Sequence, residues 1–463
     1  MTEASPASEE TPPRAGGFWS YRRQRELDFF PTGALRWWLL GLIIFAWAIE
    51  QFERLKIGPV LVYMFDDFGI SLREWGYIGA VAAVAQAGGA LLFSQLADRY
   101  GRRAIILWPV VAYLGIAVGS ALAPDFLTLA VLWVLGGTVV SGMSPAVNAA
   151  LRDITPQMGR AMVYAWLSLA FTIGALLSTW VAARTIPVWP GWRPQFWIAA
   201  GFAAVTVAVL AVFYRDLSMR VRGQIVHDRE DALAAAISEA GFADFAAAQR
   251  AGNLVYRDWR LWALSLAILF WSVAYFTVAM FVPTYFQQHF GIEASQASDL
   301  TSYFWLVFTF SVFVSGWLSD RLQVRKTVIA FGGVASGLCF LWAASRPVGT
   351  SYLELAITWC ITGWFAGFIY PAWCALVSEN AEAISPFGVA RAFGITGVLG
   401  VGSGLVFNLA LPRVVEAWGW PAWIQICALC CFAIVALVAC SRGPWRPAMG
   451  WEFGAMPSAD SRS

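Results

Sequence analysis

The feature that most constrains this chain is the spacing of its ionisable residues. Eleven stretches of at least 19 residues contain no Asp, Glu, Lys or Arg, and a helix needs about 17 to 25 mostly apolar residues to cross a lipid bilayer. These stretches are residues 75–97, 104–124, 126–151, 161–183, 194–214, 261–288, 300–319, 327–345, 355–378, 392–412 and 417–441. A twelfth crossing precedes them, where Leu39–Ile49 and Ile57–Phe65 flank a charged segment. We therefore predict an all-α membrane protein with twelve transmembrane helices.

The composition agrees with a chain solvated by lipid. Charged residues make up 13% of the sequence and hydrophobic residues 59%, whereas soluble domains carry about 25% charged residues. The formal net charge of +2 predicts no basic face for nucleic acid. The expected environment is the lipid bilayer, and we expect no nucleic-acid partner.

The distribution of Lys and Arg predicts the orientation of the chain. If both termini are cytoplasmic, the inner segments hold 24 of these residues and the outer loops hold five. Positive residues are enriched on the cytoplasmic side of membrane proteins. We therefore expect a multi-pass protein of the cell inner membrane with both termini in the cytoplasm.

The polar segments divide the chain into five parts. Residues 1–35 lack the layout of a signal peptide and are predicted to be a disordered cytoplasmic tail. Its segment Phe18–Phe30 mixes aromatic and basic residues, which favours an interfacial anchor or a solvated linker. The remaining parts are a six-helix bundle over 36–214, a cytoplasmic linker over 215–259, a second six-helix bundle over 260–441 and a cytoplasmic tail over 442–463.

The two halves repeat a motif at the same place. Ser94-Gln-Leu-Ala-Asp98-Arg99-Tyr-Gly101-Arg102-Arg103 follows the second span, and Gly316-Trp-Leu-Ser-Asp320-Arg321 follows the eighth, with the two aspartates 222 residues apart. The chain thereby resembles the major facilitator superfamily, whose signature in this loop is G-x-L-[AS]-D-R-x-G-R-R. The resemblance implies the major facilitator fold, with two bundles of six helices that rock about a central site. This sequence departs from the signature at Ser94 and at Gln323, which stand where the family has glycine.

The motif aspartates are candidates for a conformational gate. A carboxylate in a short loop can accept hydrogen bonds from a neighbouring helix N-terminus or pair with an Arg. The family resemblance makes Asp98 a latch that stabilises the outward-facing state. The alternative is that the arginines only mark the cytoplasmic side.

The first span carries a dense group of charges within its apolar sequence. Glu50, Glu53, Arg54 and Lys56 lie close together on a helix at about 100° per residue, and charges at membrane depth tend to pair and to line a cavity. Pro59 removes an amide that would bond Leu55, so we expect a bend beside these charges. The alternative is an outer half that emerges into water early.

A second resemblance concerns the same charges. Glu50-Gln-Phe-Glu53 is similar to the D-G-F-D element in the first helix of aromatic-acid:proton symporters, and Glu53-Arg54 to the Asp-Arg pair of organic anion:cation symporters. Both imply a carboxylate substrate moved with protons. In the fourth helix, however, Trp133 and Ser141 replace Arg and Gly of the pattern R-x-x-x-G-x-x-x-G found in many proton-coupled members, and only Gly137 is kept. The fifth helix also lacks the Gly-Pro pair of drug antiporters.

The second half offers polar and aromatic candidates for a central site. With the offset of 222 residues, Glu53 corresponds to Tyr275, which is our first candidate for a substrate contact. The further candidates are Ser144, Asn148, Tyr303, Trp305, Tyr370, Trp373 and Asn408.

Other patterns carry no chemistry of their own. Cys427 and Cys430 have C-x-x-C spacing but no second pair of ligands, and the glycines from Gly394 to Gly404 follow no strand, so we expect neither a metal nor a cofactor. We predict a secondary transporter, most simply a monomer and not an enzyme, that takes up a small organic anion with protons. The alternatives are a uniporter, a drug or metabolite exporter, and a polytopic membrane sensor or enzyme.

Overall fold

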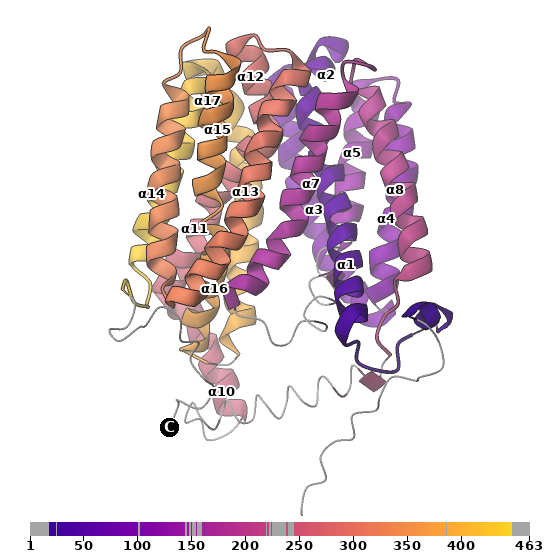
Figure 1. Ribbon diagram of the computed structural model, residues 1–463, viewed down its shortest axis with the longest axis vertical. Coiled ribbons are helices and arrows are strands. Elements are labelled where there is room, and N and C mark those ends of the chain that lie inside the picture. Colours follow the sequence, from indigo (N-terminus) through magenta and orange to yellow (C-terminus); the bar gives the residue numbers. More distant parts are fainter. Residues whose placement is uncertain are drawn as a thin grey trace, which may run out of the picture.

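The computed structural model describes residues 18–24, 26–100, 102–143, 160–218, 245–385 and 387–446, together with isolated positions from 146 to 154 and from 220 to 238. Throughout these residues the regular structure is helical (Figure 1), and the one β-bridge joins Leu27 to Leu217. The predicted all-α fold is confirmed.

The first half begins with the 3-10 helix η1 (Phe18–Arg23) and continues with helices at membrane depth. These are α1 (Gly33–Leu55), η2 (Gly58–Val60), α2 (Leu61–Phe68), α3 (Leu72–Tyr100), α4 (Arg102–Ala121), α5 (Phe126–Ser141), α7 (Arg160–Thr185) and α8 (Arg193–Phe213). Local signals set several ends: Asp125 accepts a hydrogen bond from the Thr128 amide and begins α5, while Gly69 has φ 63° and ends α2.

The second half follows the linker helices α10 (Phe245–Gly252) and η3 (Asn253–Arg257). Its elements are α11 (Trp259–Phe276), the π-helix η4 (Thr277–Phe281), α12 (Val282–Phe290), α13 (Ala294–Leu322), α14 (Arg325–Ala344), α15 (Tyr352–Ala366), α16 (Tyr370–Glu382) and α17 (Gly388–Ala439).

The described helices account for twelve crossings. Ten helical segments are long and apolar enough to span a membrane, and Phe126–Ser141 is a shorter apolar helix. The last long segment, Gly388–Ala439, contains two helices, because Gly419 has non-helical angles (φ 79°, ψ 172°). The predicted number of transmembrane helices is therefore confirmed.

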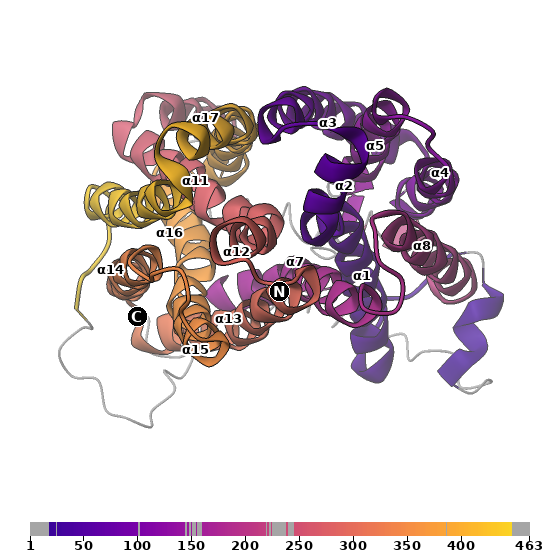
Figure 2. The same cartoon turned by 90° about the horizontal axis from the view of Figure 1, so that it is seen from above.

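The crossings form two bundles that stand side by side (Figure 2). A buried apolar cluster that includes Ile43, Ile106 and Ala203 lies within the first bundle, and another that includes Leu264, Ile329 and Val377 lies within the second. A third cluster joins them and contains residues of both, such as Leu61, Phe281 and Phe304. Helices α7 and α13 run beside each other where the bundles meet.

The two ends of the molecule differ, and we name them by their elements. The linker end carries α10, and the far end carries α2 and α12 (Figure 1). At the linker end, the segment before α1 packs on the first bundle: the Leu27 amide donates to Asp216 O (2.8 Å), and Tyr21 is buried. Burial raises the pKa of the Tyr21 hydroxyl. This segment is therefore folded onto the end of α8.

Candidate functional site

The charged group of the first span lies where its helix is interrupted. Helix α1 ends at Leu55, a 3-10 turn contains Pro59, and the α-helix resumes at Leu61. The predicted bend beside the charges is confirmed. The seventh span is interrupted at an equivalent depth by the π-helix Thr277–Phe281, which precedes Pro283.

The two interruptions pack directly against each other. A Cβ atom on Gly58 would lie 2.8 Å from the Met280 carbonyl oxygen and 3.1 Å from that of Ala279. These atoms belong to the backbone of the other half, so only a glycine permits this approach. The broken helices of the two halves thus share one junction.

The four charges divide into two pairs, and both members of the first are buried. Lys56 Nζ lies 3.1 Å from Glu53 Oε2, and both residues are buried. The ammonium also donates to the Glu53 carbonyl (2.8 Å) and to the Tyr113 hydroxyl of α4. It lies 5.0 Å and 4.8 Å from the centres of the Tyr113 and Phe196 rings, within the range of cation–π attraction.

The second pair is looser, and only its cation, Arg54, faces open space. Arg54 Nη1 lies 3.6 Å from Glu50 Oε1, and Arg54 Nη2 donates to Gln86 Oε1 of α3 at 2.7 Å. The Arg54 side chain is 31% exposed, whereas that of Glu50 is 1% exposed. Gln51 donates to the other oxygen of Glu50. Arg54 is therefore the cation of this group that a ligand can reach.

Arg54 and Glu53 line a cavity of about 330 Å³ between α1, α3, α4, α5, α8, α11, η4 and α17. Its size falls in the range of small-molecule sites. Small residues of α3, α5 and α17 form much of the wall, and five aromatic side chains complete it: Tyr113, Trp133, Phe196, Phe276 and Phe407. The polar groups of the lining include Gln86, Tyr113, Ser120, Ser141 and Asn408.

Two candidates of the second half lie at or beside this cavity. Asn408 lines it, and a Cβ atom on Gly79 would collide with the Asn408 side chain, so the two helices are in close contact there. Tyr275 does not line the cavity, but its ring packs on that of Phe276, which does, with ring centres 5.2 Å apart. Its buried hydroxyl makes no hydrogen bond and is within electrostatic range of Glu50 and Arg54.

Four other candidates that the structure describes do not line the cavity. Trp373 is buried and donates to Leu264 O (2.9 Å), which makes it a core residue of the second bundle. Tyr370 packs on Trp271 (4.6 Å between ring centres), and Tyr303 lies near the far end beside Asp299. Trp305 is buried against Tyr275, with ring centres 5.4 Å apart. Ser144 and Asn148 fall outside the described residues.

The structure adds residues that the sequence analysis did not select. Gln86 is the amide that holds Arg54, and it is the polar side chain at mid-depth of an Ala- and Gly-rich span, which is a signal that could have identified it. Tyr113 lies in an apolar stretch with no such signal. Trp133 and Ser141, which depart from the fourth-helix pattern, and Gly137, which keeps it, all line the cavity.

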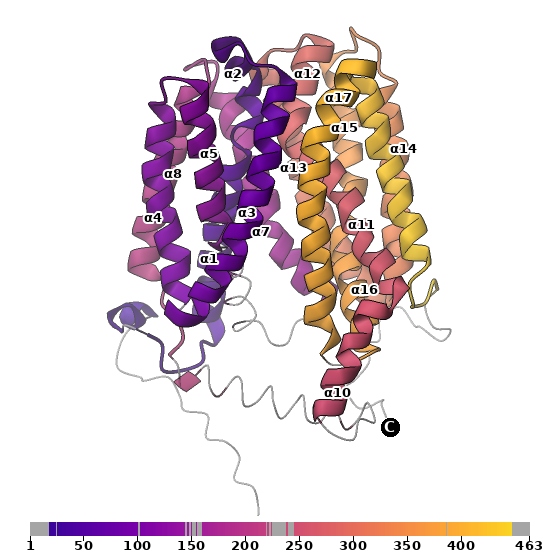
Figure 3. The ribbon, with the colours of Figure 1, turned by 180° about the vertical axis from the view of Figure 1, so that it is seen from behind.

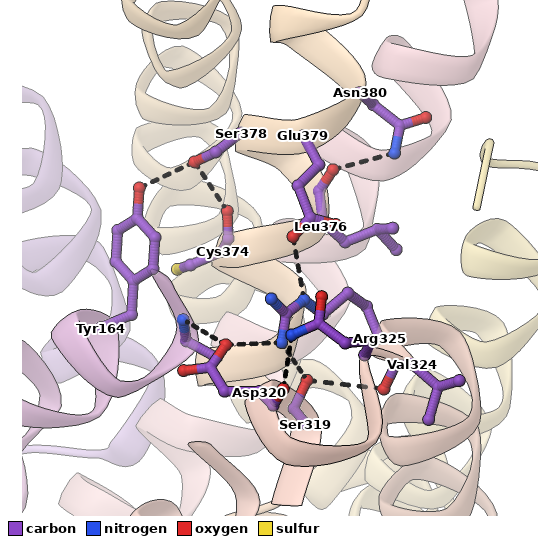
Figure 4. Close-up of polar contacts among 12 residues, drawn as sticks. Tyr164, Ser319, Asp320, Val324, Arg325, Cys374, Leu376, Ser378, Glu379 and Asn380 are labelled. Atoms are coloured by element: carbon purple, nitrogen blue, oxygen red, sulfur yellow. Dashed lines mark hydrogen bonds and ion pairs between the residues drawn. The ribbon is translucent and has the colours of Figure 1, made fainter. Parts of the chain in front are cut away.

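The second copy of the repeated motif forms a contact between the halves (Figure 4). Asp320, near the end of α13, accepts hydrogen bonds from the amides of Ala161 (3.2 Å) and Met162 (2.9 Å) in the first turn of α7. Arg325 holds the same carboxylate at 2.7 Å and also pairs with Glu379 of α16 at 3.0 Å. A carboxylate at a helix N-terminus is favoured by both the free amides and the helix dipole.

The other motif residues have different surroundings. Gly316 lets α13 approach α7, because a Cβ atom there would lie 3.0 Å from Ala165 Cβ. Arg321 lies over the Trp317 ring. In the first copy, Arg103 donates to Ala211 O within its own half (3.0 Å). Gly101 and the side chains of Asp98, Arg99 and Arg102 fall outside the described residues, so the Asp98 latch stays a prediction.

At the far end, two ion pairs cross between the halves. Arg184, near the end of α7, pairs with Asp299 of α13 at 2.9 Å, and Arg73 of α3 pairs with Glu416 of α17. Helices α3 and α17 diverge toward the linker end (Figure 3). In agreement, Cβ atoms on Gly76 and Gly79 would meet α17, whereas Cβ atoms on Gly394, Gly397 and Gly400 would have no neighbour within 4 Å.

These contacts predict opposite effects of two conservative substitutions. We expect Asp320→Asn to favour states in which α7 and α13 separate at the linker end, and Asp299→Asn to favour separation at the far end. A charge-assisted contact contributes about 1.5 to 3 kcal/mol, and its loss shifts a two-state equilibrium by that amount. Distances between spin labels at Val188 and Trp418, exposed far-end positions in opposite halves, would report both shifts. Identical label distances in the two variants would contradict the assignment.

A sequence model of the Major Facilitator Superfamily matches residues 37–298 and 285–450. The chain belongs to this superfamily of membrane transporters.

Curated relatives cover most of the chain at low identity. The Gallate transporter of Pseudomonas putida is 25% identical over 430 residues, which are 87% of this chain and 93% of the relative. The 4-hydroxybenzoate transporter PcaK of Pseudomonas aeruginosa is 23% identical over 84% of this chain and 88% of its own length. The Gentisate transporter of Corynebacterium glutamicum is 24% identical over 69% and 70%.

A solved structure shares the fold. It is a bacterial homologue of the human lysosomal transporter Spinster in an inward-facing and unoccupied conformation, with a TM-score of 0.61 and 18% sequence identity. The match covers 89% of this chain and 95% of that one. It supports the two-bundle architecture described above.

Proposed function

We propose that the protein is a secondary transporter that moves a small aromatic carboxylate across the membrane together with protons. One observation carries the proposal: Arg54 presents its guanidinium to a cavity of about 330 Å³ while Glu50 and Gln86 hold it in place. A guanidinium binds a carboxylate through two parallel hydrogen bonds. The substrates named for the three curated relatives, which are gallate, 4-hydroxybenzoate and gentisate, support the same class.

The lining of the cavity supports a ring on the anion. The aromatic side chains Trp133, Phe196, Phe276 and Phe407 offer faces and edges for an aromatic ring. The glycines of α5 and α17 leave flat backbone surface between them.

Proton coupling follows from the competition for Arg54. An arriving anion pairs with Arg54 at the expense of Glu50, and protonation of Glu50 removes that competitor. Proton and anion then strengthen each other's binding by the same coupling free energy. A uniporter of the same fold would be distinguished from this symporter by uptake that does not respond to a pH gradient.

The contacts between the halves support alternating access. Two ion pairs and the contact of Asn408 with Gly79 close the far end, while α3 and α17 separate toward the linker end. With the linker end in the cytoplasm, as the Lys and Arg distribution favours, this is an arrangement that releases substrate inward. We propose bundles over 36–214 and 260–441 that rock about the cavity in a monomer whose termini are both cytoplasmic.

Counterflow in proteoliposomes tests the proposal. Vesicles loaded with unlabelled 4-hydroxybenzoate should take up labelled 4-hydroxybenzoate faster than empty vesicles, and excess gallate or gentisate should compete. Xylose and a cationic dye serve as controls from other substrate classes. Absence of counterflow with all three aromatic acids would overturn the proposed function.

A further inference from the structure

The two acidic residues of the first span have unlike surroundings, although the sequence presents them as equivalent. Glu53 and Glu50 lie one helical turn apart on α1, each with a basic partner on the same helix. The partner of Glu53 is Lys56, and the partner of Glu50 is Arg54. What distinguishes the pairs is how completely each cation is already bonded.

Lys56 has no bonding capacity left for a ligand. An ammonium has three N–H donors, and Lys56 uses them on Glu53 Oε2, on the Glu53 carbonyl and on the Tyr113 hydroxyl. Its side chain is 2% exposed, and two rings flank it. Neutralising Glu53 would leave this cation buried without its counter-ion, which costs several kcal/mol. The Glu53–Lys56 pair therefore stays ionised through a transport cycle.

Glu50 is held more loosely by its cation. Its ion pair with Arg54 is 3.6 Å long, against 3.1 Å for Glu53 and Lys56, while Oε1 of each carboxylate accepts no hydrogen bond. Arg54 keeps a hydrogen bond to Gln86 at 2.7 Å, so it remains in place when Glu50 loses its charge. Neutralising Glu50 therefore leaves Arg54 anchored and available to an anion in the cavity.

The surroundings of Glu50 contain few other ionisable groups. On its own helix it faces Arg54, the Gln51 amide and, more distantly, Glu53; α11 contributes the Tyr275 hydroxyl. Helices α7 and α8 pack against α1, and their ionisable residues lie at the helix ends. These are Arg160, Tyr164, Arg184 and Arg193.

We propose that Glu50 alone carries the coupling proton and that Glu53, Lys56 and Tyr113 form a permanent ion-pair group that fixes the helix break. The inference rests on the proposed function. One proton and one monovalent anion then bind together, and their charges cancel. The four side-chain charges also sum to zero when all are ionised, so the site has no net charge with or without the bound pair. Transport is electroneutral, with one proton per aromatic monocarboxylate.

The first test measures how many protons the unmodified protein transports with each anion. Labelled 4-hydroxybenzoate is the probe. Coupling to one proton gives about tenfold accumulation per pH unit, since one unit corresponds to a tenfold ratio, and no response to a potassium diffusion potential. Accumulation of about a hundredfold per pH unit, or a response to the potential, would overturn the proposal. Absence of counterflow would instead overturn the proposed function, so the two failures are distinguishable.

Two variants assign the proton to a residue. Glu50→Gln should retain counterflow and lose all accumulation driven by the pH gradient. The double variant Glu53→Gln/Lys56→Met removes both charges of the Glu53–Lys56 pair, so no buried charge is left without a partner. Its accumulation ratio should stay about tenfold per pH unit, whatever happens to its rate. Loss of accumulation with retained counterflow in the double variant, or retained accumulation in Glu50→Gln, would sink the assignment.

Discussion

Replacement of Arg54 by Ala should abolish the binding of aromatic carboxylates. Arg54 is the cation that reaches the cavity, and it is held between Glu50 at 3.6 Å and Gln86 at 2.7 Å. Hydrogen bonds to a charged group contribute about 1.5 to 3 kcal/mol, so loss of the two bonds of a guanidinium–carboxylate pair should weaken binding at least about a hundredfold. Isothermal titration of purified protein with 4-hydroxybenzoate would measure the loss. Arg54→Lys keeps the charge but not the planar guanidinium with its two parallel N–H donors, and it should recover part of the affinity.

Folding and binding effects of this substitution can be separated. Arg54→Ala leaves Glu50 buried without its partner, which is itself destabilising. The double variant Arg54→Ala/Glu50→Gln should restore thermal stability but not binding. Arg346→Ala is a matched control, since Arg346 is partly buried like Arg54 and pairs with Glu354 outside the cavity. Near-normal affinity of Arg54→Ala would place the anion elsewhere.

Replacement of Gly58 by Val should block transport while leaving the protein folded. A Cβ atom at Gly58 would lie 2.8 Å from the Met280 oxygen, 3.0 Å from its Cα and 3.1 Å from the Ala279 oxygen. Overpacking costs about 1 to 3 kcal/mol, and here the cost falls on the state in which the two helix breaks touch. We expect the far end to remain open, with a longer distance between labels at Val188 and Trp418, and counterflow reduced about tenfold or more.

Gly41→Val is the matched control for this prediction. Gly41 lies on the same helix, α1, and a Cβ atom there would have no neighbour within 4 Å. It should transport at a near-normal rate with unchanged label distances. Normal counterflow by Gly58→Val would show that the junction of the two breaks does not have to close during transport.

The architecture could be predicted from the sequence because the membrane imposes a length on each apolar stretch. The twelve crossings, the interruption near Pro59 and the clustering of Glu50, Glu53, Arg54 and Lys56 follow from local sequence and agree with the structure. The contacts between helices could not be predicted from the sequence. The choice of Tyr113 as the partner of Lys56 depends on how α4 packs on α1, and no local pattern encodes it.

The aromatic candidates show the same limit of prediction from sequence. Trp373 and Tyr303 have the chemistry of substrate contacts, yet the rotation of their helices turns them into the second bundle and toward the far end. Trp133 points into the cavity from α5, in the place where many proton-coupled members of the family have Arg. Composition identifies residues that are able to bind a substrate, but helix orientation decides which of them meet it.

The unequal attachment of the two bundles has a consequence for the route to the cavity. Helices α7 and α13 are joined at both ends, by Arg184–Asp299 and by Asp320 on the first turn of α7, while α3 and α17 spread apart toward the linker end. An opening of this kind is wedge-shaped, with its broad edge between α3 and α17 (Figure 3). On these two helices Leu91, Leu92 and Val398 are exposed, and exposed apolar side chains of a membrane protein contact lipid acyl chains. We therefore expect the composition of the surrounding lipid to affect how quickly the proposed substrate enters and leaves.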